Sequence, residues 1–224
     1  MILIYRVVVL GFGLALSAGA CADGPSIARN GTAAAPACQT CHGPAGEGVA
    51  QANFPRLAGL GAAYLKRQLD AFADGTRQNA SMMPIAMALS GADRTDLANY
   101  YAALPAPAMV PAVAATTVPS SSAASSATAV VSVGATLAMR GRWADSLPAC
   151  EQCHGPGGRG VGPEFPALTG QSSTYLAAQL TAWKAGTRPP GPQALMSVVA
   201  KKLSPAEVLA VADYFASLPS KAGR

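Results

Sequence analysis

The sequence has few charged and few aromatic residues for its length. Of its 224 residues, 12% are charged and 6% are aromatic, although 50% are apolar, and alanine supplies much of that apolar share. This length suits one medium-sized domain or two small domains of roughly 100 residues each. Small domains with so few large side chains often need a metal or a cofactor as part of the core. We therefore expect a folded chain with a non-protein group in its interior.

The sequence also lacks a hydrophobic run of membrane-spanning length. The apolar run at residues 7–16 has about ten residues, whereas a spanning helix needs roughly 20. Arg6 precedes this run and Ala18-Gly19-Ala20 follows it, which is the pattern of a secretory signal peptide and its cleavage site. We therefore expect residues 1–20 to be a signal peptide and the mature protein to lie outside the cytoplasm.

Cys21 directly follows the predicted cleavage site and leaves a second outcome open. An acylated Cys21 would anchor the protein and give it a peripheral association with the membrane. Ala18 occupies the position where a lipoprotein signal normally has leucine. Ordinary cleavage is therefore the favoured outcome.

One unit of the sequence occurs twice. CQTCHGP at residues 38–44 recurs 112 residues later as CEQCHGP, and FPRLAG at residues 54–59 recurs 111 residues later as FPALTG. The duplication predicts one domain over residues 21–105 and a second over residues 134–224. Residues 106–133 contain prolines, alanines and a serine-rich tract but no charged residue, which is typical of a linker. A buried strand or helix is the alternative there, and the serines and prolines disfavour it.

Helical patterns recur in both halves and no sheet pattern does. Apolar residues at helical spacing follow Tyr64 and Tyr175, and again follow Ser90 and Ser204 at the end of each half. Ser204 opens the sequence SPAE, a capping box with proline at the first helical position. The fold class is therefore all-α with long loops. We also expect a short helix over residues 134–142, with the alanine-rich residues 32–37 as its equivalent.

Each copy of the repeated motif has two cysteines three positions apart and a histidine directly after the second. Two such thiols can add to the two vinyl groups of haem while the histidine binds the iron. A disulfide or redox pair would leave the histidine unexplained in both copies. A four-cysteine zinc site is disfavoured because 108 residues separate the two pairs, far more than in a zinc ribbon. We therefore expect two covalently attached haem c groups, held by two identical sets of residues: Cys38, Cys41 and His42, and Cys150, Cys153 and His154.

The sequence contains only two histidines, and both belong to these motifs. Neither iron can therefore have a second histidine ligand, so methionine is the first candidate for the distal position. Met196 is the one methionine after His154, and it stands seven residues before Leu203. The equivalent position in the first half is Met82, with Met83 as the alternative. A lone methionine is usually core filler, but here the repeat favours ligation, and we expect both methionines in irregular segments between helices.

The motif CQTCHGPAGEG, the segment FPRLAGLGAAYLKRQL and the methionine followed by LS resemble a class I cytochrome c, and their duplication resembles cytochrome c4. The resemblance covers nearly all of the chain outside the predicted signal peptide and linker. It implies two tandem cytochrome c domains with His/Met haems. It also implies a periplasmic carrier that takes electrons from a membrane complex and passes them toward a terminal oxidase. The predicted linker is longer than the short connection of that family, whose two domains pack closely.

These observations favour electron transfer over catalysis. Methionine opposite histidine keeps the iron six-coordinate, so no substrate needs to reach the metal. A haem peroxidase needs an open coordination position and is disfavoured by the histidine count. A third hypothesis is a cytochrome subunit or electron acceptor of a periplasmic or membrane dehydrogenase. We expect redox proteins as partners and no nucleic acid, because haem propionates would offset part of the net positive charge.

Overall fold

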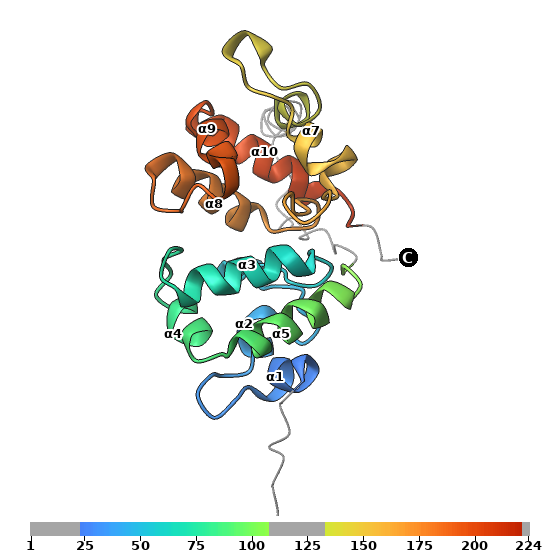
Figure 1. Ribbon diagram of the computed structural model, residues 1–224. Coiled ribbons are helices and arrows are strands. Elements are labelled where there is room, and N and C mark those ends of the chain that lie inside the picture. The colour runs from blue at the N-terminus through green and yellow to red at the C-terminus, as the bar shows by residue number, and fades with distance from the viewer. Residues whose placement is uncertain (1–22, 108–132, 221–224) are drawn as a thin grey trace, which may run out of the picture.

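A computed structural model describes residues 23–107 and 133–220, and these two ranges form two helical domains. The predicted signal peptide, Cys21 and most of the predicted linker lie outside the described residues. Within the described ranges the chain has helices and three isolated β-bridges but no strand, so the predicted all-α class is confirmed. Figure 1 shows the two domains stacked one above the other, with α3 and α8 at the boundary between them.

The first domain is built from five α-helices and one short 3₁₀ helix. In chain order they are α1 (Gly24–Asn30), α2 (Gln39–His42), η1 (Ala50–Ala52), α3 (Ala62–Ala73), α4 (Met82–Met87) and α5 (Gly91–Ala103).

The second domain repeats the order of the α-helices and has additional 3₁₀ helices between them. It begins with helical residues 133–140, followed by η2 (Trp143–Asp145), α7 (Cys150–His154), η3 (Pro156–Gly158), α8 (Ser173–Ala185), η4 (Pro192–Ala194), α9 (Leu195–Lys201) and α10 (Pro205–Ser217).

Local signals define the last helix of each domain. The hydroxyl group of Ser204 accepts a hydrogen bond from the Glu207 backbone N–H, and the Glu207 carboxylate accepts one from the Ser204 N–H. Ser90 and Asp93 form the same reciprocal cap at α5. These bonds satisfy backbone donors that the first turn of a helix leaves unpaired. The predicted starts of both helices are therefore confirmed.

The helix that leads into the first motif is not where the sequence analysis expected it. Residues 32–37 contain no helix, and the equivalent of helical residues 133–140 is α1, which ends at Asn30, before this segment begins. The carboxylate of Asp23 accepts a hydrogen bond from the Ser26 N–H and caps α1, and Gly31 ends it with φ of 73°. Alanine content was a weaker signal than this cap, because helix ends depend on specific hydrogen bonds.

In each domain the first and last helices cross at a glycine. A Cβ atom on Gly24 of α1 would lie 2.3 Å from the Asp96 carbonyl oxygen of α5. A Cβ atom on Gly134 would lie 2.1 Å from the Ala210 carbonyl oxygen of α10. Only glycine lets the two backbones approach this closely. These crossings hold each core together far from the domain boundary, and α5 runs between α1 and α3 (Figure 1).

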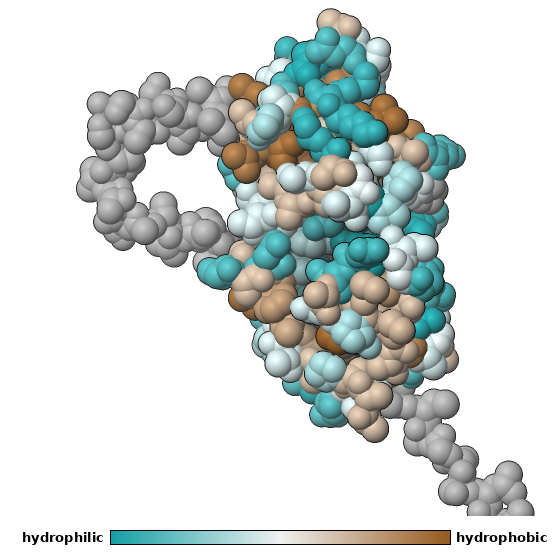
Figure 2. Space-filling model, turned by 90° about the vertical axis from the view of Figure 1, so that its left-hand side faces the viewer, coloured by the Kyte–Doolittle hydropathy of each residue, from teal (hydrophilic) through white to brown (hydrophobic). Residues whose placement is uncertain are grey.

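The two domains have separate apolar cores and also contact each other. The first core contains Ile27, Leu65, Leu89, Leu97 and Tyr101, and the second contains Leu137, Leu147, Leu203, Val208 and Val211. Hydrogen bonds cross the boundary at several points, including one from Arg67 of α3 to the Pro163 carbonyl and an ion pair between Arg67 and Glu164. Figure 2 shows the two domains in contact over a broad front on one face. The length of the linker therefore does not prevent close packing of the domains.

Candidate haem sites

The first motif lies on α2 and the residue before it. Cys38 and Cys41 are free thiols, and His42 is buried behind them with 7% of its surface exposed. The Nδ1 atom of His42 lies 2.9 Å from the Pro55 carbonyl oxygen. That carbonyl can only accept, so Nδ1 carries the proton and Nε2 is left with a free lone pair. Burial lowers the pKa of the His42 imidazole, which favours the neutral form that binds metals.

The second motif has the same arrangement on α7. Cys150 and Cys153 are free thiols, and burial raises the pKa of the Cys150 thiol to about 11. His154 is also 7% exposed, and its Nδ1 lies 2.8 Å from the Pro166 carbonyl oxygen. Burial lowers the pKa of His154 as well. Both domains therefore present a neutral imidazole with its Nε2 lone pair unused.

Glycines directly after each motif let the chain turn back toward the core. Gly46 and Gly158 both have positive φ, and a Cβ atom on either would lie within 3 Å of an aromatic ring, that of Tyr101 or Phe215. A larger residue would push this ring away from the loop. The glycine-rich stretches after the histidines therefore serve close packing behind each site.

One apolar cavity of about 1340 Å³ runs through both domains. All eight predicted site residues line it: Cys38, Cys41, His42, Met82, Cys150, Cys153, His154 and Met196. Its size and apolar walls suit large planar apolar groups. The structure therefore brings each predicted pair of cysteines, histidine and methionine to the same space.

The two candidate methionines lie on short helices and not in irregular segments as the sequence analysis expected. Met82 is the first residue of α4, and Met196 is the second residue of α9. Met82 lines the cavity, whereas Met83 does not and Met87 is 65% exposed. The irregular backbone lies just before Met196, where Gln193 and Ala194 both have positive φ.

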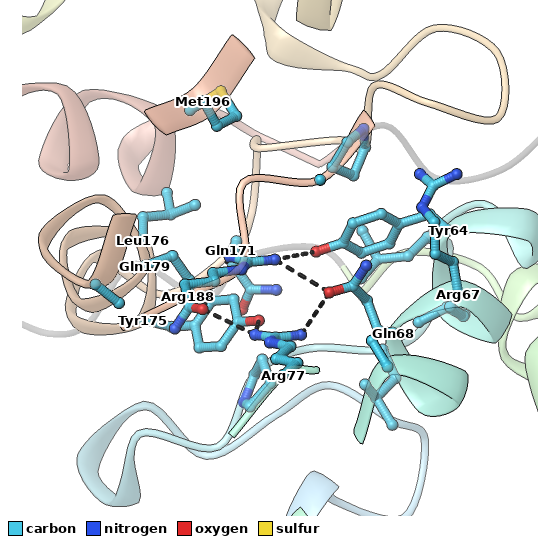
Figure 3. Close-up of a pocket in the computed structure, with 18 of the residues that line it drawn as sticks. Tyr64, Arg67, Gln68, Arg77, Gln171, Tyr175, Leu176, Gln179, Arg188 and Met196 are labelled. Carbon is cyan, nitrogen blue, oxygen red and sulfur yellow. Dashed lines mark hydrogen bonds between the residues drawn. The ribbon is translucent and has the colours of Figure 1, made fainter. Parts of the chain in front are cut away.

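Two buried arginines meet where the cavity crosses the domain boundary (Figure 3). Arg77 donates to Gln68 Oε1 of its own domain at 2.7 Å and to Gln179 Oε1 of the other domain at 2.8 Å. Arg188 donates to the same two oxygens, at 3.1 and 2.8 Å respectively. Each arginine also donates to a tyrosine hydroxyl group of the opposite domain, that of Tyr175 or Tyr64.

This arginine pair was missed in the sequence analysis. Arg77 and Arg188 are each 7% exposed, and neither forms an ion pair with a carboxylate of the described residues. Two neighbouring buried cations with only neutral partners are costly unless an anion compensates them. A signal was available, since GTR at residues 75–77 recurs as GTR at residues 186–188.

The model of the cytochrome c family matches residues 28–104 and again residues 134–219. The chain belongs to the cytochrome c family. The two matched ranges coincide with the two domains, and the predicted membership among dihaem cytochromes c is confirmed by the relatives that follow. The chain therefore holds two covalently attached haem c groups and transfers electrons.

The curated relatives include two groups that match most of the chain. A thiosulfate dehydrogenase electron acceptor of Stutzerimonas stutzeri (strain A1501) is 46% identical over 202 residues, which cover 89% of this chain and 88% of the relative. Cytochrome c4 of Pseudomonas aeruginosa is 34% identical over 220 residues, with 97% of this chain and 98% of the relative covered. Both groups align over nearly their whole length, so this chain shares their two-domain organisation.

The chain is also similar to solved structures of a thiosulfate dehydrogenase and of cytochromes c4. The chain superposes on thiosulfate dehydrogenase (TsdBA) from Marichromatium purpuratum with a TM-score of 0.75 and 39% identity, covering 87% of this chain and 39% of that one. It superposes on reduced recombinant cytochrome c4 from Pseudomonas stutzeri with a TM-score of 0.68 and 31% identity, covering 81% and 93% of the two chains. In the described ranges no helix is long and apolar enough to cross a membrane.

Proposed function

We propose that each domain holds its haem through its own motif. Cys38 and Cys41 form the thioether bonds in the first domain, and Cys150 and Cys153 form those in the second. His42 and His154 would hold the irons through Nε2, and Met82 and Met196 would supply the second protein ligand of each iron. All eight residues line one cavity, and both histidines have Nδ1 already bonded, which supports this assignment. Bound haem c supplies one-electron chemistry at the iron.

The buried arginine pair would hold the propionates of the two haems. Guanidinium groups bind carboxylates through two parallel hydrogen bonds, and Arg77 and Arg188 face the cavity without a carboxylate partner from the described residues. Propionates in this position would neutralise both buried cations.

We propose that the protein accepts electrons from a thiosulfate dehydrogenase in the periplasm and performs no catalysis of its own. Two observations support this partner. Electron acceptors of thiosulfate dehydrogenase are 46% identical to this chain, against 34% for cytochrome c4 of Pseudomonas aeruginosa. The second observation is the Marichromatium purpuratum TsdBA structure, in which this protein covers 39% of the matched chain. A region similar to this protein therefore stands in one chain with other parts of a thiosulfate dehydrogenase. Delivery to a terminal oxidase is a second function, supported by the cytochrome c4 relatives, and it would be the next step for the same electrons.

Stopped-flow reduction tests the proposed donor. Oxidised protein is mixed with thiosulfate and a catalytic amount of thiosulfate dehydrogenase, and haem reduction is followed by absorbance. We expect reduction of both haems over successive turnovers of the dehydrogenase, and no reduction when the dehydrogenase is omitted. A monohaem cytochrome c serves as the control for unspecific electron transfer. Equal rates for the two cytochromes would contradict a specific donor.

A further inference from the structure

His42, the proposed iron-binding histidine of the first domain, is connected to the second domain through a single peptide unit. The carbonyl group of this unit belongs to Pro55 and accepts the hydrogen bond from His42 Nδ1. Its N–H group belongs to Arg56 and donates to the Gln171 side-chain oxygen at 2.9 Å. The Gln171 amide also donates to the Arg56 carbonyl at 3.0 Å. A second-domain side chain therefore holds the peptide that orients His42.

The side chain of Arg56 adds hydrogen bonds to the second domain beside this contact. It is 2% exposed and donates to the carbonyls of Thr169 at 2.8 Å, Gly170 at 3.0 Å and Ala58. Burial lowers the pKa of Arg56 to about 10, so the guanidinium group stays charged at neutral pH. The backbone on both sides of the boundary is thus tied together next to the His42 acceptor, and Gln171 is itself only 3% exposed.

The second domain has no equivalent of this contact. In the repeat register Ala167 stands where the first domain has Arg56, and Leu60 stands where the second has Gln171. His154 still donates to the Pro166 carbonyl, but leucine offers no acceptor for the Ala167 N–H. The two sites also differ at their first cysteines, since Cys38 is hydrogen-bonded to Tyr101 and Cys150 to the Leu137 carbonyl, but both of these contacts stay within one domain. Only the first haem is therefore connected to the opposite domain through its histidine.

We propose that Gln171 of the second domain is a positioning residue that lowers the reduction potential of the haem in the first domain. An acceptor on the N–H side of a peptide polarises its carbonyl, and hydrogen bonds in such a chain strengthen one another. A stronger bond from Nδ1 makes the imidazole a better electron donor to a bound metal. A better donor stabilises the oxidised iron. The inference rests on the proposed role of His42 as an iron ligand.

Two substitutions in the full holoprotein test the proposal. Gln171→Leu has similar size but removes the acceptor, so the potential of the first haem should rise. Gln171→Glu keeps an acceptor at the Arg56 N–H and adds negative charge, so the same potential should fall. Spectroelectrochemical titration measures both potentials, and methionine variants assign each one to its domain. Arg67→Ala is the control, because it removes the interdomain ion pair with Glu164 without touching the Pro55–Arg56 peptide.

Opposite shifts of the first potential in the two variants, with the second potential unchanged, would support the proposal. Equal shifts of both potentials would mean that the substitution only separates the domains. Unchanged potentials, shifts in the same direction, or a shift confined to the second haem would equally overturn it. Failure of the underlying ligand assignment is visible separately, because the unsubstituted protein would then lack the optical spectrum of two histidine-ligated haems.

Discussion

At the residue scale, the proposed sites assign one histidine to each iron and leave the other position of each iron to a different side chain. Each histidine has its Nδ1 bonded to the carbonyl of the proline that follows a phenylalanine, Pro55 or Pro166. Such a bond fixes both the tautomer and the ring orientation. The distal ligand is the part of the site that substitution can test most directly.

Met196→Ala should lower the potential of the second haem and leave that of the first largely unchanged. Thioether sulfur stabilises reduced iron, and its loss removes that preference. The sulfur-to-iron charge-transfer band should drop to about half its strength in the variant, since one of two methionines is lost. A band of full strength would show that Met196 is not a ligand.

The same experiment separates Met82 from Met83 in the first domain. Met82→Ala should remove the half of the charge-transfer band that does not depend on Met196. Met83→Ala, the matched control one residue away, should leave the band intact. The repeat register and the cavity lining both favour Met82. The reverse pattern would move the ligand to Met83.

Residues of a local motif could be predicted from the sequence, whereas residues that act across the boundary could not. The cysteines and histidines are identified by their spacing, and Met82 is selected by its position in the repeat. Arg77 and Gln171 have partners about 100 residues away in the chain, at Gln179 and Arg56. The repeated GTR marks Arg77 and Arg188 as equivalent residues, but no sequence pattern marks the partners of Arg77 or Gln171, because these depend on how two folded units pack.

At the scale of elements, the crossing of the first and last helices depends on glycine in both domains. Gly24→Ala would place a methyl group against backbone atoms of Asp96, which cannot move without shifting α5. We expect a loss of about 1–3 kcal/mol in the free energy of unfolding, the usual cost of overpacking. Thermal or denaturant unfolding of the holoprotein measures it. Gly61→Ala is the control, since a Cβ atom there meets nothing within 4 Å. Equal stability of the two variants would contradict the role given to this crossing.

Helix starts could be predicted where two side chains form a reciprocal capping box. They were harder to predict where a single capping residue marks the start. The boxes at Ser90 and Ser204 give unambiguous starts. The start of α1 depends on Asp23 followed by Gly24 and Pro25, a short signal three residues after the predicted signal peptide that the sequence analysis did not use. Alanine has high intrinsic helix propensity, but a nearby cap and a terminating glycine decide where a short helix forms.

At the scale of the whole molecule, the duplication gives two similar haem sites. The two sites differ in the contacts that each makes across the domain boundary. The arginine pair repeats in both domains, whereas Arg56 and Gln171 each occur in one domain only. Domain packing could not be predicted from the linker, because linker length limits only how far the domains can separate. The contacts that hold the domains together come from the folded surfaces.

Intact-mass spectrometry of the mature protein tests the central claim that each domain binds one haem through its own cysteines. The unsubstituted chain should carry the mass of two haems after denaturation. Double replacement of Cys38 and Cys41 by alanine should leave one haem, and so should double replacement of Cys150 and Cys153. A lipid increment in the same spectra would reveal acylation of Cys21. A mass equal to the polypeptide alone, or two haems retained in either double variant, would contradict the account.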